Sequence, residues 1–491
     1  MSEYILFIKR VRLIGVAKFI TSFRGLILLP ILTKTLGAAG YGVWSQILIT
    51  VGLAMPFVML GLNSAILRFL SAEKEKKNTA KGIFTVIFTI LSVSIIFALF
   101  LFLLSDSFAK ILLKDISVAP LIKIASLLII LEALNQISLE PFRIFGQIRK
   151  YSTLTILQTF LEIGLVSFLV LSGFGLFGAI VGLLVVKGII LLFSLFFIIS
   201  QTGFALPDFS ILKSYLIFGL PLIPTVIFIM IIASSDRYVI GFFKGATSVG
   251  IYSAAYSIGI MALMFLYPIV YILSPTIFKL FDEKEIDKVK TYLSYSLKYF
   301  FLFSIPSVFG LFVLAKPILT ALATTEFVSL VTIFIVLLVA LSMIFEGIRA
   351  IFGEVLMLFK RTKILGGAAI TAGLINLILN ILFIPYFGII AAAVTTLISY
   401  AILGLTMYYY SRKYMKFNIN LNFILKSIFA STAMALVVYI FSPVSIIDIF
   451  LAIGISVIVY FGLIFLLKGF KKEELKIFSQ VLKLNRIYEK L

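Results

Sequence analysis

Long apolar runs alternate with short polar segments along the whole chain of 491 residues. About 20 apolar residues in a row span the hydrocarbon core of a bilayer as one helix. The sequence therefore predicts about fourteen such helices, at approximately 12–33, 44–65, 83–104, 118–140, 153–172, 178–199, 214–242, 249–274, 292–314, 327–348, 364–384, 388–410, 424–442 and 446–467. The runs are continuous and do not alternate with period two, so we expect an all-α integral membrane protein and not a β-barrel.

The apolar pattern also repeats itself in the same direction along the chain. Leu36–Ser45 (LGAAGYGVWS) recurs as Phe243–Ser253 (FKGATSVGIYS), and Phe174–Val181 (FGLFGAIV) recurs as Phe387–Val394 (FGIIAAAV). The offset drifts only from about 208 to about 213 residues, so the two copies are collinear. Two parallel halves are typical of a transporter whose site lies where the halves meet. The expected units are two six-helix lobes, two extra helices and a basic cytoplasmic tail, at 1–205, 206–415, 416–467 and 468–491.

Three local features refine this layout. Pro221 and Pro224, early in the seventh predicted helix, predict a kink there. The N-terminus carries positive charge before an apolar run, as a signal peptide does, but it lacks a small-residue cleavage site, so we expect it to remain as the first helix. The tail places apolar residues among lysines near helical spacing, which fits either an interfacial helix on the inner leaflet or a frayed basic extension.

Composition narrows the chemistry. Hydrophobic residues make up 62% of the chain and charged residues 13%, far from the usual composition of soluble globular proteins. The chain has no Cys and no His, which excludes disulfides, thiolate or imidazole metal sites and Ser-His catalysis. We therefore expect no metal and no cofactor.

The net charge of +21 follows membrane topology. With the N-terminus inside, roughly 29 basic residues fall on the inner side and about 5 on the outer side, which is a strong positive-inside bias. We expect the protein to lie in the plasma membrane. An even number of helices then places both of its termini in the cytoplasm. The charge indicates attraction to anionic lipids rather than binding of nucleic acid.

Cations within the spans are the first functional candidates, because a charge at a helix centre costs about 2.5–3.5 kcal/mol on insertion scales. Arg24 lies near the middle of the first predicted helix, and Arg237 lies in the outer half of the seventh, its counterpart. Lys187 lies in the middle of the sixth span, whereas Lys123 is close enough to a helix end to reach the interface instead. We predict a cationic substrate-binding cavity formed by Arg24, Arg237, Lys187 and Lys123.

Acidic residues share these spans. Asp236, Glu132 and Glu162 are candidates for coupling to Na⁺ or protons, or for partnering the cations. Glu346 and Arg349 are spaced i, i+3 and form a candidate structural pair on one helix. Cations exceed acids among the deep groups, which favours an anionic ligand, and a guanidinium fork fits the geometry of a phosphate.

The segment Phe218–Tyr256, FGLPLIPTVIFIMIIASSDRYVIGFFKGATSVGIYSAAY, resembles the polysaccharide flippases. The matching elements, in order, are Gly219-Leu220-Pro221, Asp236-Arg237 and Val249-Gly250-Ile251-Tyr252 with Ala254. The echo Tyr41-Gly42 and the fourteen-span layout extend the likeness over essentially the whole chain. The superfamily also contains the multidrug-and-toxin extruders and the lipid-linked murein-precursor flippases.

The resemblance implies a two-lobed alternating-access bundle with its first, second, seventh and eighth helices around a cationic cavity. It implies a flippase, and not an enzyme, that moves polyprenyl-(di)phosphate-linked oligosaccharides to the outer leaflet for surface polysaccharide (O-antigen type) assembly. Its expected partners are this substrate, membrane lipids and other membrane proteins of polysaccharide assembly.

The alternatives within the superfamily are a murein-precursor flippase, which also has fourteen spans, and a drug extruder, which usually has twelve. A glycosyltransferase or polymerase would need acidic catalytic groups on a sizeable outer loop, and the sequence offers none. A major-facilitator transporter would need a basic Gly-x-x-x-Asp-Arg loop after the second helix, where this chain reads RFLSAEKEKKNTAKG from Arg68 to Gly82.

Overall fold

The structure is a computed structural model that describes residues 3–70, 73, 75–470 and 474. Those residues form α-helices with short 3₁₀ and π segments and contain no β-strand, which confirms the all-α class. The predicted tail helix lies outside the described residues, except that Glu474 is placed. The basic side chains of Lys9, Arg10 and Arg12 also lie outside them.

The helices follow the apolar runs. The first group is α1 Glu3–Met59, α2 Leu62–Leu70, α3 Lys76–Leu103, α4 Ser105–Phe108, α5 Ala119–Ala125, α6 Leu127–Ile144, α7 Ile148–Leu169 and α8 Gly175–Thr202. The second group is α9 Leu212–Gly219, α10 Ile223–Lys244, α11 Ala246–Gly259, α12 Leu266–Asp282, α13 Ile286–Leu322, α14 Leu330–Leu358, α15 Thr362–Phe387 and α16 Ile389–Tyr414. The last two are α17 Leu421–Phe441 and α18 Ile446–Leu466. Below, the first half means α1–α8 and the second half α10–α16.

Within the described residues, 12 continuous segments are long and apolar enough to cross a membrane. Two of them are each a pair of helices joined at glycine. Phe19–Met59 is broken at Gly37 (φ 66°, ψ −175°), and Ile148–Thr202 is broken at Gly173 and Gly175, both with positive φ. Dividing these two gives the predicted number of about fourteen crossings. The protein is therefore a multi-pass membrane protein.

Some predicted helices contain breaks. The kink expected at Pro221 appears as the 3₁₀ turn Leu220–Leu222 (η5) between α9 and α10. The predicted span 249–274 is interrupted by a second 3₁₀ turn, Ile260–Leu263 (η6), which separates α11 from α12. Neither glycine nor proline lies within η6, so the composition of this segment gave no sign of it.

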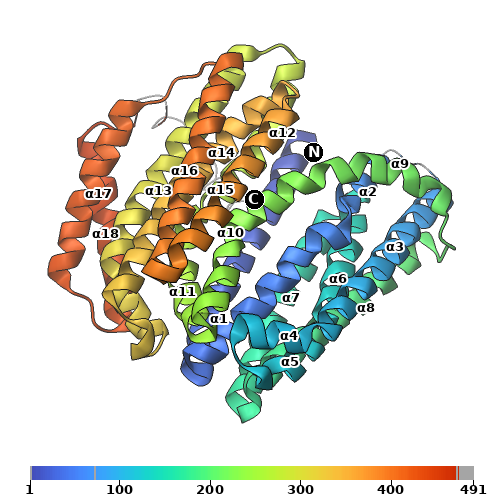
Figure 1. The fold of residues 1–491 in the computed structure, drawn as a ribbon. Helices are drawn as coiled ribbons and strands as arrows, with labels where there is room; N and C mark the ends of the chain where they lie inside the picture. Colours follow the sequence, from blue (N-terminus) through green and yellow to red (C-terminus); the bar gives the residue numbers. More distant parts are fainter. Residues whose placement is uncertain (1–2, 71–72, 74, 471–473, 475–491) are drawn as a thin grey trace, which may run out of the picture.

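The helices gather into two groups with α1, α10 and α11 between them (Figure 1). Gly37 and Gly245, aligned by the repeat, share one backbone conformation, with φ/ψ of 66°/−175° and 79°/−179°. Gly175 and Gly388 share another, with 54°/−139° and 68°/−151°. A conformation with positive φ is open to glycine at little cost. The repeat is thus present in the backbone, while the boundaries proposed at 205 and 415 stay predictions.

The linker between the halves is fastened to α3. The backbone N–H of Asp208 donates to Thr85 Oγ1 at 2.8 Å. The Asp208 carboxylate accepts from the N–H and the hydroxyl of Ser210, and these hydrogen bonds lower the pKa of Asp208.

At the Gly37 and Gly245 end, the two halves touch through their backbones. A Cβ added to Gly42 would lie 1.9 Å from the carbonyl oxygen of Ala246, and one added to Gly250 would lie 1.9 Å from that of Ala38. Only glycine permits helices to approach this closely. Ser45 and Ser253, also aligned by the repeat, share a hydrogen bond of 2.8 Å between their hydroxyls.

Charged side chains complete this contact, which we call the closed end. The N–H of Ala38, at the start of the second stretch of α1, donates to the Glu326 carboxylate at 2.7 Å. Lys114 donates to the carbonyl of Phe243, near the carboxyl end of α10, at 2.8 Å, and Lys34 donates to that of Ala321, near the end of α13, at 2.7 Å. An anion at a helix start and cations at helix ends match the helix dipoles.

The glycine contact predicts how the closed end responds to an added methyl group. In a chain without other cysteines, Ser45→Cys with Ser253→Cys should form a disulfide on oxidation, because the two hydroxyls are adjacent. Adding Gly42→Ala should reduce the yield at least about threefold, since its Cβ would overlap Ala246 and misalign the two sulfur atoms. The control is Gly188→Ala, where the added Cβ meets nothing within 4 Å. Equal yields with Gly42→Ala and Gly188→Ala would contradict the contact.

Candidate functional site

A cleft of about 1570 Å³, counting the part open to solvent, lies between the two halves. Its wall is formed by α1, α6 and α8 from the first half and by α10, α11, η6, α14 and α16 from the second. On α1 the lining residues run from Arg24 to Gly52, on both sides of the break at Gly37. The cleft is thus built by the repeat, where a parallel two-half chain was expected to place its site.

Four charged residues line this cleft, and all four were predicted from the sequence: Arg24, Glu132, Lys187 and Arg237. Three cations and one carboxylate therefore face the cavity. The acidic partners Glu162 and Asp236 are fully buried and do not line it. The cleft wall is cationic even though each of its cations has an acidic partner.

In the first half, the charges form an alternating chain. Glu162 on α7 pairs with Arg24 and with Lys187, whose Nζ lies 3.1 Å away, and also accepts from Gln158 at 2.9 Å. Lys187 on α8 also pairs with Glu132 on α6 at 2.5 Å. Buried ions are tolerated when they are paired and hydrogen-bonded. Arg24 still keeps 42% of its side chain exposed, so it remains open to a ligand.

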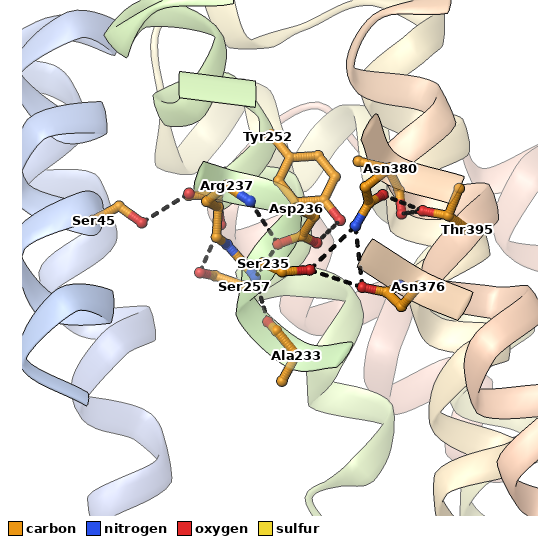
Figure 2. A network of polar contacts seen from close by, with 12 residues as sticks. Ser45, Ala233, Ser235, Asp236, Arg237, Tyr252, Ser257, Asn376, Asn380 and Thr395 are labelled. Carbon is orange, nitrogen blue, oxygen red and sulfur yellow. Dashed lines mark hydrogen bonds and ion pairs between the residues drawn. The ribbon is translucent and has the colours of Figure 1, made fainter. Parts of the chain in front are cut away.

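In the second half, Asp236 and Arg237 pair with each other on α10. Arg237 Nη1 lies 3.0 Å from Asp236 Oδ1, and the hydroxyl of Tyr252 donates to the other carboxylate oxygen at 2.5 Å (Figure 2). The Arg237 guanidinium also lies 3.7 Å from the ring centre of Tyr256, close enough for a cation–π interaction. Tyr256 lines the cleft together with Arg237.

Beside Asp236 lies a polar network that the sequence analysis missed. Ser235 donates to Asn376 Oδ1 at 2.9 Å, Asn380 Nδ2 donates to the same oxygen at 3.0 Å, and Thr395 donates to Asn380 (Figure 2). All four side chains are buried. They tie α10 to α15 and α16 and fix the helix that carries Asp236 and Arg237. The i, i+4 asparagines in an apolar span were the signal that could have revealed them.

The remaining predicted residues lie apart from the cleft. Lys123 on α5 is not among the lining residues, and its Nζ pairs with Asp106 at 3.1 Å, with both side chains partly exposed. Its alternative interpretation, a lysine that reaches the interface, fits this position. Glu346 and Arg349 form the bidentate pair predicted for their spacing, with both contacts at 2.6 Å on α14. Among the residues that the structure describes, no group of three or more Asp or Glu side chains is placed to hold a metal ion.

Solved structures share this architecture. The lipid II flippase MurJ in an inward closed conformation superposes with a TM-score of 0.74 at 18% identity, covering 93% of this chain and 98% of that one. An inward-facing multidrug resistance transporter of the MATE family superposes with a TM-score of 0.67 at 17% identity, covering 81% and 97%. At these identities the likeness establishes the fold alone, a helical membrane bundle of the kind seen in MurJ and the MATE family.

The sequence assigns the family more narrowly. Residues 7–281 match the family of polysaccharide biosynthesis proteins, so the chain belongs to that family and the resemblance drawn from Phe218–Tyr256 is confirmed. The probable low-salt glycan biosynthesis flippase Agl15 of Haloferax volcanii is 24% identical over 229 residues, 46% of this chain. That match spans 48% of the length of Agl15.

The charge chain generates a prediction about stability. Lys187→Met leaves Glu132 and Glu162 facing each other and should lower the free energy of unfolding by about 3–5 kcal/mol. Adding Glu132→Gln should recover part of this loss, because it removes one uncompensated charge. Lys123→Met is the control, since the partly exposed pair that it breaks is worth at most about 1 kcal/mol. Thermal unfolding of the purified protein in detergent measures all three, and equal midpoints for Lys187→Met and Lys123→Met would contradict the network.

Proposed function

We propose that the chain is a flippase that carries polyprenyl-(di)phosphate-linked oligosaccharides from the inner to the outer leaflet of the plasma membrane, and that it is not an enzyme. The observation that carries the proposal is the cleft between the two halves, whose wall holds Arg24, Lys187 and Arg237. The family and the flippase among its relatives support the same conclusion.

The charges of the cleft suit a phosphate or diphosphate. Sugar hydroxyls and a phosphate cannot enter hydrocarbon without losing water, and that loss carries a large free-energy cost. In the cleft, Arg24 and Arg237 offer guanidinium forks and Lys187 an ammonium, which are the usual phosphate ligands. Glu162 and Asp236, behind the wall, hold these cations in place while the cleft is empty. Arg24 keeps 42% of its side chain exposed, whereas the side chains of Lys187 and Arg237 are each about 6% exposed, so an incoming anion meets Arg24 first.

An apolar groove beside the cleft suits the prenyl tail. The groove, of about 940 Å³ counting open space, is lined by residues of α13, α17 and α18 and by Met261 and Met264 at η6. Ile260 and Leu263 of the same 3₁₀ turn line the central cleft. One turn of chain therefore separates the two spaces, so a lipid could keep its headgroup in the cleft and its tail in the groove. A 3₁₀ segment within a helix often marks a hinge.

The closed end supplies one of the two gates that alternating access requires. It lies on the side of the membrane opposite to the N-terminus, which the positive-inside bias places outside. In this orientation both termini are cytoplasmic and the structure is shut toward the outer face. Rocking of the halves would break the contacts at Ala38 and Phe243 and open the cleft outward.

The proposal predicts that Arg24→Ala abolishes surface glycan while the protein stays at normal levels in the membrane. Arg237→Ala should do the same when it is combined with Asp236→Asn, which removes the buried carboxylate that would otherwise be left unpaired. The matched control is Lys123→Ala, which removes a cation of the first half that does not line the cleft and should leave glycan unchanged. Glycan stain of whole cells and immunoblots of membranes measure both quantities. Normal glycan in both arginine variants would overturn the role of the cleft.

Deletion of the gene separates the alternatives of the same fold. Under the proposal, a lipid-linked oligosaccharide of the surface polysaccharide accumulates on the inner leaflet. Accumulation of a lipid-linked murein precursor would favour the alternative that the chain is a murein-precursor flippase. Accumulation of a small amphiphilic dye would favour a drug extruder. Partner proteins of polysaccharide assembly remain part of the proposal, to be sought by cross-linking in membranes.

The outer gate has its own test, which uses the absence of cysteine in the chain. In a Ser253→Cys background, Glu326→Ala removes the acceptor of the Ala38 N–H and should raise labelling by a membrane-impermeant maleimide from outside by at least about twofold. Glu283→Ala, which removes an exposed acid at the other side of the membrane, is the control. Labelling that is unchanged by Glu326→Ala would contradict a gate at this end.

A further inference from the structure

A second cationic pocket lies outside the cleft, where the ends of α12, α14 and α16 and the start of α13 come together. It measures about 920 Å³, counting the part open to solvent. Its cationic lining residues are Lys290, Arg412, Lys413 and Lys416, and no carboxylate lines it. These helix ends lie on the same side of the membrane as the N-terminus, so the positive-inside orientation places the pocket at the inner surface.

Aromatic groups hold two of these cations in place without neutralising them. Arg412 Nη1 donates to the Tyr408 hydroxyl at 2.5 Å, and the guanidinium lies 5.4 Å from the centre of that ring. Lys413 Nζ lies 4.4 Å from the ring centre of Tyr409 and 5.1 Å from that of Tyr410. Cation–π contacts orient a charge but leave it positive. Both cations therefore remain available to an anion.

Lys290 differs because it has an acidic partner. Its Nζ lies 3.0 Å from Asp287, but the Asp287 side chain is 96% exposed. Water screens a pair of this kind, so it contributes little and exchanges readily for a competing anion.

The walls of the pocket are apolar and aromatic. Phe281 and Phe359 pack edge to face with ring centres 5.2 Å apart, and Phe359 also contacts Tyr414. Aromatic side chains with cations beside them are typical of the level of lipid headgroups. A small inorganic anion would make no use of these walls, whereas the glycerol and upper chains of a lipid would.

The cations at the end of α16 do not follow from the repeat. With the offset of about 213 residues fixed by Phe174 and Phe387, Arg412, Lys413 and Lys416 fall opposite Ile199, Ser200 and Gly203. The equivalent end of α8 is therefore uncharged at these three positions. The positive charge at this end of α16 is therefore not required by the fold that the two halves share.

We propose that this pocket binds the phosphate of an anionic phospholipid of the inner leaflet. Basic pockets between membrane helices on the cytoplasmic side recognise such headgroups through their charge. Arg412 supplies a fork for the phosphate oxygens, the lysines supply further charge, and Phe281 and Phe359 contact the apolar part of the lipid. The bound lipid joins the ends of four helices of the second half. The proposal does not depend on what the central cleft transports.

The test uses the purified full-length protein in a non-ionic detergent. Dioleoylphosphatidylglycerol should raise the thermal unfolding midpoint more than dioleoylphosphatidylcholine, because a ligand stabilises the state that binds it. In the variant Arg412→Gln/Lys413→Gln/Lys416→Gln, the phosphatidylglycerol concentration for half the rise should increase at least about tenfold. The matched control, Lys76→Gln/Lys77→Gln/Arg149→Gln, removes three exposed cations of the same membrane side from the first half and should behave as the parent.

Each other outcome counts against the proposal. Equal unfolding midpoints with the two lipids, or an equal loss of phosphatidylglycerol dependence in the two triple variants, would mean that the lipid responds to general surface charge and not to this pocket. If inorganic phosphate alone raises the unfolding midpoint, and the triple variant at Arg412, Lys413 and Lys416 abolishes this increase, the pocket is a site for free phosphate and not for lipid. If the triple variant at Arg412, Lys413 and Lys416 has a lower unfolding midpoint even without lipid, the comparison is repeated with the single variants Lys413→Gln and Lys416→Gln. An unchanged dependence on phosphatidylglycerol in both single variants would overturn the assignment.

Discussion

The central constraint on this structure is that cations within the membrane need acidic partners and must still be able to bind a ligand. Glu162 and Asp236 are fully buried, and their cationic partners occupy the wall of the cleft in front of them. The acids compensate the cost of placing Arg24, Lys187 and Arg237 at this depth. Of these three cations, Arg24 is the one that keeps a large part of its side chain exposed, so the cleft offers its positive charge mainly at Arg24.

The repeat explains why the cleft and its closure belong together. Gly42 and Gly250 lie at equivalent positions and touch the opposite half in equivalent ways. The groups around them are not equivalent: an acid, Glu326, meets a helix start, whereas Lys114 and Lys34 meet helix ends. The backbone contact therefore follows the symmetry of the fold, while the charged contacts at the closed end do not.

Much of the fold could be predicted from the sequence because its determinants are local. A run of apolar residues defines a membrane helix, and a repeated glycine pattern reveals the halves. The pairing of charges could not be predicted in this way. Lys187 has no partner on its own helix, and its two acids come from α6 and α7. Lys123 was grouped with the cleft cations by its chemistry alone, although it lies elsewhere. The network of Ser235, Asn376, Asn380 and Thr395 requires three helices, α10, α15 and α16, to be in place.

The segment after α18 has a bearing on how this protein can be handled. Lys298 on α13 is buried, contacts both carboxylate oxygens of Glu474 at 2.9 and 2.7 Å, and lies 4.8 Å from the ring centre of Phe423 on α17. Glu474, which follows the final crossing, is thus bound to the core of the bundle. Shortening the protein before this glutamate for expression or crystallisation would strand an ammonium group among aromatic rings and loosen the last two helices from the bundle.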